Sequence, residues 1–350
     1  MRRTTNSAVR RVADLPVAIA TDVGLKRTEN QDRAAILRIP QLKEVPTVIL
    51  VLCDGMGGMI DGAFCASLAI SSFLFSFVNN ENSPLKDRLI SSVLQANDAV
   101  FEKYKGTGGS TLSAFVIDSQ EGNLGVNVGD SRIYSMEEHT LSQMTVDDTL
   151  AGQFAKENND FFRGNELLQY IGMGQGIEPH VINYLPANEK FTSILLTSDG
   201  VHFLENRIME LITEHATDSA VAVRRLVELA KWCGGHDNAT AVIANLSNMI
   251  FDKTNLNLGE LEVWDAFGEL RLINNQNPDK TIIQNKKSAL EIQTSTNQQA
   301  ELSKEAVSKS QTRKRQKTPS NPKKKKINKS ENENPEIKEL PQLQIDFDTK

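Results

Sequence analysis

Five short motifs place an aspartate beside a glycine or another small polar residue. They are Asn30-Gln31-Asp32, Asp54-Gly55, Gly129-Asp130-Ser131, Ser198-Asp199-Gly200 and His236-Asp237-Asn238. Hard divalent cations such as Mg²⁺ and Mn²⁺ take oxygen ligands, which carboxylates and backbone carbonyls supply. A neighbouring glycine lets the chain bend so that its carbonyl can also face an ion. One Asp-Gly pair is typical of an ordinary turn, but five such motifs at the ends of expected strands favour a cation site.

Two divalent cations held close together can share a bridging water and lower its pKa, which makes it a nucleophile. They also shield the negative charge of a phosphoester, so the motifs suit phosphoester hydrolysis. A cysteine-based mechanism would instead need a cysteine and an arginine separated by five residues. The residues six positions after Cys53, Cys65 and Cys233 are Met59, Ser71 and Ala239. The sequence therefore excludes the cysteine-based mechanism.

Alternating strands and helices are expected to position these motifs between about residue 15 and residue 246. Apolar, β-branched runs predict strands at 16–20, 45–53, 111–117, 124–128, 132–136, 191–197 and 238–246. Apolar residues at helical spacing predict helices at 62–78, 84–105, 201–215 and 218–232. Strands that meet through short turns, with helices in adjacent pairs, indicate a mostly antiparallel α+β sandwich rather than βαβ units.

Composition divides the chain further. Residues 1–13 are predicted to be a flexible N-terminus and residues 14–249 a packed domain. Residues 274–350 are dominated by Asn, Gln, Lys, Ser and Glu, so they cannot bury enough apolar surface to fold alone and predict a disordered tail.

Four apolar residues between the domain and the tail recur at a spacing of about three: Leu258, Leu261, Trp264 and Phe267. This spacing predicts a short amphipathic helix within 250–273 that packs back on the domain. Near the C-terminus, Leu343, Ile345 and Phe347 alternate with polar residues. That alternation is typical of a strand, although chance explains it better at this length.

Charge is distributed unevenly along the chain, whose formal net charge is −6. Residues 311–330 hold nine Lys or Arg and no acid, so the other 330 residues carry −15. Such an acidic body disfavours nucleic acid as the main partner and fits a site that concentrates cations, although a solvated acidic surface is the commoner explanation. The basic run 312–329 could contact nucleic acid or an anionic surface, or act as a nuclear import signal. A solvated linker is the favoured interpretation.

Three cysteines, an odd number, sit in apolar or mixed runs, which indicates reduced thiols in a cytoplasmic protein. The basic N-terminus is not followed by an apolar signal segment. The most apolar stretch, residues 68–78, is interrupted by serines and shorter than the ~20 residues that span a bilayer. We therefore expect a buried helix, no transmembrane segment, and a cytoplasmic location, or a nuclear one if the host is eukaryotic and the tail acts as an import signal.

A set of motifs in a particular order carries a family resemblance. It consists of Thr21-Asp22-Val23-Gly24 through Asn30-Gln31-Asp32-Arg33, Asp54-Gly55-Met56-Gly57-Gly58, Gly109-Ser110-Thr111, Gly129-Asp130-Ser131-Arg132, Thr197-Ser198-Asp199-Gly200 and Asp237-Asn238-Ala239-Thr240. Over about residues 15–246 the chain resembles the metal-dependent, type 2C (PPM) protein phosphatases, and the bacterial-style branch most closely. The resemblance implies a four-layer αββα sandwich of two antiparallel sheets flanked by helices. It also implies a serine/threonine phosphatase in which a water bridging two Mn²⁺ or Mg²⁺ ions attacks phosphoserine or phosphothreonine.

The resemblance assigns roles by position. Asp54 would bridge the two ions, Asp199 and Asp237 would complete one of them, and the Gly55 carbonyl would serve the other. Asp32 would bind through water. Two further positions match as well: Asp130 would help to hold a third, weaker ion, and Arg27 would grip the substrate phosphate, because its guanidinium fork matches two phosphate oxygens.

The chain departs from the family pattern in two places. Met56 stands where eukaryotic members often carry a histidine, and a thioether cannot donate a proton to the leaving alkoxide. A metal-bound water or another imidazole would have to do so, and His236 is a candidate, either as the acid or as an orienting group. Residues 145–149 replace an Asp-His-Ser motif that precedes a mobile flap, here expected at about 150–179. Phe161-Phe162 in that flap fits packing better than a substrate pocket.

The resemblance also implies a partner: a phosphorylated protein, namely a serine/threonine kinase or its targets, bound by a monomer. The alternative is an inactive phosphatase-fold module that binds phosphoproteins or regulates another protein. Loss of a metal ligand would be the usual sign of inactivity. Asp54, Asp199, Asp237 and Arg27 are all present, which favours an active enzyme.

Overall fold

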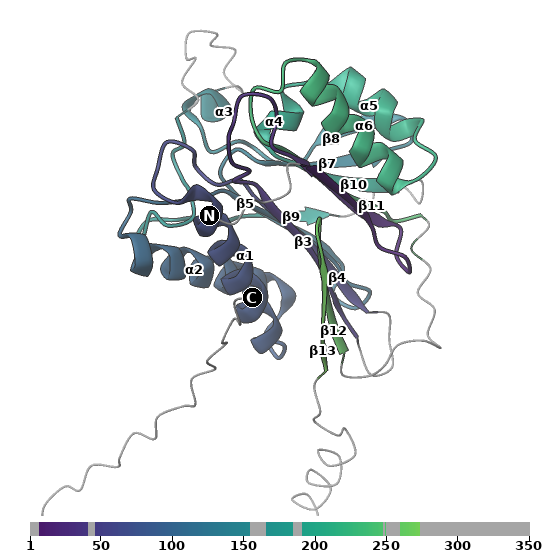
Figure 1. Cartoon of the computed structure of the whole chain (residues 1–350). Coiled ribbons are helices and arrows are strands. Elements are labelled where there is room, and N and C mark those ends of the chain that lie inside the picture. The colour runs from purple at the N-terminus through teal and green to yellow at the C-terminus, as the bar shows by residue number, and fades with distance from the viewer. Residues whose placement is uncertain are drawn as a thin grey trace, which may run out of the picture. The chain divides into compact units, whose positions relative to one another are not determined.

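The computed structural model describes residues 7–40, 46–154, 166–184, 191–247, 249 and 260–273. Within these residues, two antiparallel β-sheets lie face to face and helices cover the outer surface of each sheet (Figure 1). The predicted four-layer αββα sandwich is confirmed.

The first sheet has the strand order β1-β2-β11-β10-β7-β8. Its strands are β1 (Ser7–Arg11), β2 (Val17–Asp22), β11 (Ala239–Asn245), β10 (Phe191–Thr197), β7 (Arg132–Glu137) and β8 (Thr140–Gln143). All neighbouring strands are antiparallel. Strand β2 is buried along its whole length because it has a neighbour on either side and packed layers above and below.

The second sheet has the order β13-β12-β3-β4-β5-β6-β9. Its strands are β13 (Glu269–Ile273), β12 (Glu260–Asp265), β3 (Arg33–Ile39), β4 (Thr47–Cys53), β5 (Leu112–Ile117), β6 (Asn123–Val128) and β9 (His180–Tyr184). The central strands β4 and β5 are buried throughout. Their nearly continuous apolar sequences are typical of strands covered on both faces.

Helices α1 (Gly62–Asn79) and α2 (Leu85–Tyr104) pack on the second sheet, and α4 (Asp199–His202), α5 (Asn206–Glu214) and α6 (Ser219–Trp232) pack on the first (Figure 1). Helix α3 (Leu150–Phe154) follows β8. Asp218 caps α6, because its carboxylate accepts hydrogen bonds from the backbone of Ala220 and Val221. The sequence placed one helix over 201–215, whereas the structure has α4 and α5 there.

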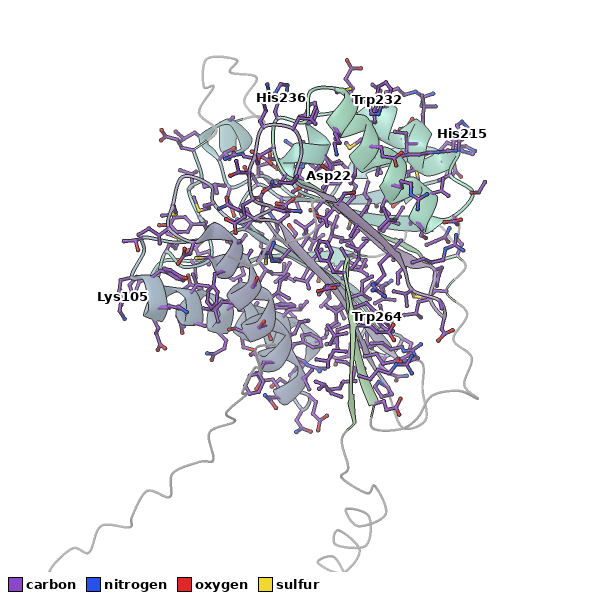
Figure 2. The ribbon with its side chains drawn as sticks, in the orientation of Figure 1. Asp22, Lys105, His215, Trp232, His236 and Trp264 are labelled. Carbon is purple, nitrogen blue, oxygen red and sulfur yellow. The ribbon has the colours of Figure 1, made fainter. Side chains whose placement is uncertain are left out.

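Three apolar layers hold the sandwich together. Phe73 and Phe77 of α1 belong to the layer between the helices and the second sheet. Ile19 and Trp264 belong to the layer between the two sheets (Trp264 is labelled in Figure 2), and Leu226 of α6 belongs to the layer above the first sheet. Each sheet is therefore covered on both faces, and this packing holds the ends of its strands in place.

The prediction of a flexible N-terminus over 1–13 is wrong for residues 7–11. These residues form β1, which pairs with β2 from Ser7 opposite Asp22 to Arg11 opposite Ala18. Three consecutive residues of the strand are only partly exposed. Local sequence did not reveal the strand because its partner supplies the hydrogen bonds that order it.

The prediction of an amphipathic helix within 250–273 is also wrong wherever the structure describes that segment. Residues 260–273 form a hairpin of β12 and β13, and β12 pairs with β3. In its turn, Asp265 Oδ1 accepts a hydrogen bond from the backbone N–H of Phe267 at 2.7 Å. The three-residue spacing hid the two-residue alternation of a strand. Leu261 and Val263 pack on the face of the second sheet that α1 and α2 cover, and Glu262 lies on the opposite face.

Helix α1 has 18 residues and contains the apolar stretch 68–78. By length and composition alone it could cross a membrane, but half of its most apolar window is buried inside the protein, and a core helix passes the same test. Several other predictions fall outside the described residues: the pair Phe161-Phe162, residues 250–259, and the tail with its basic run 312–329.

Candidate metal centre

Asp32 and Asp54 lie at the same end of the second sheet on neighbouring strands. Asp32 immediately precedes β3 and Asp54 immediately follows β4, and Arg33 pairs with Cys53 between them. The ladder therefore brings the two aspartates together although 22 positions separate them in the sequence.

Asp199 and Asp237 lie at the corresponding end of the first sheet. Asp199 begins α4 after β10, and Asp237 lies just before β11, which pairs with β10. Asp130 lies in the turn that carries the chain from β6 in the second sheet to β7 in the first. We call Asp32, Asp54, Asp130, Asp199 and Asp237 the aspartate cluster.

The carboxylates of the aspartate cluster are buried or partly buried and repel one another. Burial raises the pKa of Asp54 well above its ordinary value, and the charges of the other four aspartates raise it further. Burial, followed by the charge of Asp237, raises the pKa of Asp199. Burial also raises the pKa of Asp32 to about 7 and that of Asp130 to about 6. A cation would relieve this repulsion and stabilise the ionised carboxylates.

Two buried oxygens of the cluster, Asp32 Oδ1 and Asp199 Oδ1, have no hydrogen-bond partner in the part of the chain that the structure describes. Leaving such an atom unpaired costs ~1–3 kcal/mol, which an ion or an ordered water would offset. Across the same residues, no three His, Cys, Asp or Glu side chains converge closely enough to hold an ion by themselves. Ions here would also need carbonyl and water ligands, which Mg²⁺ and Mn²⁺ accept, so the all-oxygen donor set fits these cations.

Gly55 occupies a place that only glycine fits. A Cβ atom there would lie 2.3 Å from the carbonyl oxygen of Gly62 and 2.9 Å from that of Gln31. The Gly55 N–H donates to the Gln31 carbonyl at 3.3 Å. The loop after Asp54 is thus packed tightly against the loop that carries Asp32, as a shared site requires.

Hydroxyl groups hold the cluster in place, and the sequence did not single them out. Ser198 Oγ donates to Asp32 Oδ2 at 2.7 Å. The Asp54 N–H donates to Thr111 Oγ1 at 2.9 Å, and the Thr111 N–H donates to the Asp54 carbonyl at 2.8 Å. Thr111 Oγ1 also lies 2.8 Å from Ser131 Oγ, which ties the Asp54 loop to the Asp130 turn. All three lie within motifs that carry the family resemblance, but those motifs did not reveal which groups they bond to.

Asn238 joins the Asp237 loop to the long loop between β2 and β3. Its Oδ1 accepts the Gln31 N–H at 2.7 Å, and its Nδ2 donates to the carbonyls of Val23 and Glu29 at 3.0 Å each. The side chain is buried, so its amide group makes these three hydrogen bonds to the backbone in place of hydrogen bonds to water.

We expect Asn238→Ala to lower the free energy of unfolding by about 2–3 kcal/mol, because it leaves buried backbone groups without partners. Urea denaturation followed by circular dichroism would measure this loss. Asn79→Ala, at an exposed position at the end of α1, is the control and should change stability by less than about 0.5 kcal/mol. Equal effects of the two substitutions would contradict the role given to Asn238.

Arg27 reaches the cluster from the same loop. Its Nη2 lies 2.6 Å from Asp237 Oδ2, and its side chain is 43% exposed. The hydrogen bond to Asp237 raises the pKa of Arg27, and the charges of Asp199 and Asp54 add to the effect. A Cβ atom on Gly57 would lie 2.7 Å from Arg27 Nη1, so that glycine makes room for the guanidinium. The structure therefore places Arg27 at the cluster with an exposed cationic group.

The structure locates three residues that bear on proton transfer. Met56 follows Gly55 and is partly exposed. His236 is exposed at the outer edge of the molecule (Figure 2), and its ring packs edge-on against Phe203 with centroids 6.3 Å apart. Burial, together with the charge of Arg132, lowers the pKa of His202 to about 3, so its imidazole is neutral at neutral pH. A proton-donating role for His236 stays a prediction.

A cavity of about 690 Å³ adjoins the aspartate cluster. Asp130 and Asp199 line it together with Asp147, Thr149 and Phe203. Four of residues 145–149, where the sequence departs from the family pattern, thus form part of its wall, and Asp148 does not. The cavity gives a substrate access to two of the five aspartates.

Comparison with known proteins identifies relatives of the chain. No protein-family model matches it. The serine/threonine protein phosphatase PstP of Mycobacterium tuberculosis is 27% identical over 254 residues, which cover 69% of this chain and 46% of PstP. The chain thus spans about half the length of that relative.

Many solved structures match the fold, among them two mycobacterial phosphatases. The PPM Ser-Thr phosphatase MsPP from Mycobacterium smegmatis, in complex with cacodylate, has a TM-score of 0.56 and 29% identity, covering 66% of this chain and 97% of that one. The catalytic domain of PstP in complex with two manganese ions has a TM-score of 0.53 and 25% identity, covering 68% of this chain and 98% of that one. In sequence and in fold the chain is therefore similar to bacterial-style PPM phosphatases.

Proposed function

We propose that this protein is a metal-dependent serine/threonine phosphatase that hydrolyses phosphoserine and phosphothreonine in proteins. The observation that carries the proposal is the aspartate cluster. Five loops from both sheets contribute to it, two of its buried oxygens have no hydrogen-bond partner among the described residues, and Arg27 lies beside it. Clusters of strongly perturbed carboxylates in a cleft are typical of functional sites.

The residues would divide the work as follows. Two Mn²⁺ or Mg²⁺ ions, when bound, would supply an activated water and shield the charge of the phosphoester. Asp54 would hold both ions, Asp199 and Asp237 one of them, and the Gly55 carbonyl the other. Two aspartates would play lesser parts: Asp32 would act through water, and Asp130 would help to hold a third ion.

Arg27 would bind the substrate phosphate. Its guanidinium is held at the cluster by Asp237 at 2.6 Å and presents donors in a rigid fork that matches two phosphate oxygens. The thioether of Met56 has no proton to give, so the leaving alkoxide would take its proton from water or from the imidazole of His236.

The relatives support the cofactor and the substrate class. A PstP structure contains two manganese ions, and PstP is described as a serine/threonine protein phosphatase. We propose phosphorylated proteins as substrates, among them a serine/threonine kinase or its targets.

The test is an assay of the full-length chain on a phosphothreonine peptide. We expect steady phosphate release with Mn²⁺, no release after dialysis against EDTA, and recovery when Mn²⁺ is added back. Release that persists undiminished in EDTA would overturn the metal-dependent mechanism. Binding of the peptide without release under any condition would instead support an inactive phosphoprotein-binding module.

A further inference from the structure

Asp148 is a fully buried aspartate between β8 and α3 that none of the roles above uses. Its Oδ2 accepts the backbone N–H of Gly129 at 2.9 Å. Its Oδ1 lies 2.9 Å from His180 Nε2 and accepts from Gln169 Nε2 at 3.2 Å. One carboxylate thus joins three separate parts of the chain.

On one side, Asp148 holds the turn that presents Asp130. The Asp148 N–H also donates to the Gly129 carbonyl at 3.1 Å, so Gly129 is bonded through both of its backbone groups. Gly129 has φ of +101°, and a Cβ atom there would lie 2.7 Å from Thr111 Cγ2. The turn can therefore neither accept a larger residue nor shift toward Thr111.

Asp147 holds the other end of the same turn. Both of its oxygens accept hydrogen bonds from Arg132, at 2.7 to 3.1 Å. Asp130 is bracketed by Gly129 and Arg132, and each of these is bound by one of two consecutive aspartates. The pair Asp147-Asp148, which departs from the family pattern, thus sets where the Asp130 turn lies.

On its other side, Asp148 holds residues 166–180, the base of the expected flap. The Leu168 N–H donates to the Asp148 carbonyl at 2.7 Å, in addition to the contacts of Gln169 and His180. Further along this segment, Ile171 exchanges two backbone hydrogen bonds with Ser110, at 2.7 and 3.1 Å. Ser110 precedes Thr111, which binds the Asp54 backbone, so the segment touches the loops of both Asp54 and Asp130.

We propose that Asp148 is a positioning residue that couples the 166–180 segment to Asp130 through His180 and Gln169. The proposal rests on the proposed function, in which Asp130 would help to hold a third ion, and it takes the 166–180 segment to contact the bound peptide. Loss of the Asp148 hydrogen bonds shifts the Asp130 turn and the 166–180 segment together. Asp54 stays in place because its backbone is bonded to Thr111. Asp148 therefore governs the weakest cation site and peptide binding more than the chemical step.

The test compares Asp148→Asn with Asp118→Asn. Asp118 is also buried and accepts two backbone N–H groups, those of Gln120 and Glu121, and the Thr47 hydroxyl, but it lies at the opposite end of β5 from Thr111. Calorimetric titration of the metal-free full-length chain with Mn²⁺ should show the weakest resolved site weakened about tenfold in Asp148→Asn and unchanged in Asp118→Asn. The KM for a phosphothreonine peptide should rise about tenfold in Asp148→Asn, with kcat within about threefold.

Equal Mn²⁺ affinities and KM values for the two variants would overturn the proposal and leave Asp148 a purely structural residue. If Asp148→Asn does not fold, His180→Ala removes the imidazole, the shorter of the two side-chain contacts on the flap side, and keeps the bond to Gly129. It should raise KM with little change in kcat, and an unchanged KM would overturn the coupling. Absence of phosphate release from the unaltered protein would refute the proposed function, whereas the calorimetric comparison would still test the role of Asp148.

Discussion

Asp54→Asn is expected to lower kcat/KM for a phosphothreonine peptide by on the order of 10³-fold or more, because the neutral amide cannot bridge two cations that activate a water. In metal-free buffer the same substitution should raise the melting temperature. Asp54 is buried among four other carboxylates that raise its pKa, so removing its charge relieves both desolvation and repulsion. A gain of ~1 kcal/mol corresponds to a rise of about 2–4 °C for a domain of this size.

A fall in kcat/KM together with a rise in melting temperature distinguishes a functional residue from a structural one. Differential scanning calorimetry and a phosphate-release assay on the same preparations would measure both effects. Asp118→Asn is the matched control: it turns one acceptor oxygen of a carboxylate that accepts three hydrogen bonds into a donor, so it should lower the melting temperature and leave kcat/KM within about twofold. Activity of Asp54→Asn within tenfold of the unaltered protein would remove Asp54 from the metal centre.

Trp264→Ala is expected to lower the free energy of unfolding by about 3–5 kcal/mol. The indole is 4% exposed and belongs to the apolar layer between the two sheets, and the Arg38 guanidinium lies 5.4 Å from its ring centre. Removing it would open a cavity in that layer and take away the main anchor of the β12–β13 hairpin.

The chain contains its own control for this substitution. Trp232, the other of its two tryptophans, is 89% exposed at the end of α6 (Figure 2). Trp232→Ala should therefore change stability by less than about 0.5 kcal/mol in urea denaturation. Similar losses from both substitutions would mean that residues 260–273 do not pack as β12 and β13.

The central strands and long helices could be predicted because their apolar patterns are long and mostly unambiguous. The edges of the sheets could not. β1 and the β12–β13 hairpin are short, and their order depends on hydrogen bonds from β2 and β3. In the hairpin, the apolar residues fit a three-residue spacing and a two-residue alternation equally well, and only the partner strand decides between them.

The sequence predicts the aspartates of the site but not the contacts of the residues that support them. The aspartate motifs stand out in the sequence because ligand chemistry restricts residue type, and the fold brings all five near enough for the charges of the other four to act on Asp54. Asn238 and Thr111 lie in the motifs as well, but the sequence does not show what the supporting residues contact. Asn238, Thr111 and Asp148 act through contacts with residues far away in the sequence, and an isolated polar residue next to a turn gives no sign of such a contact.

The aspartate cluster draws its members from both sheets, with Asp130 on the chain's passage from one to the other. Cations bound there would act as a cross-link between the two halves of the sandwich at one end. Because only the folded chain assembles the site, each cation would add about 2.7 kcal/mol to stability at a free concentration one hundred times its dissociation constant. Removing these ions would therefore make the protein more susceptible to proteolysis, in addition to inactivating the proposed phosphatase.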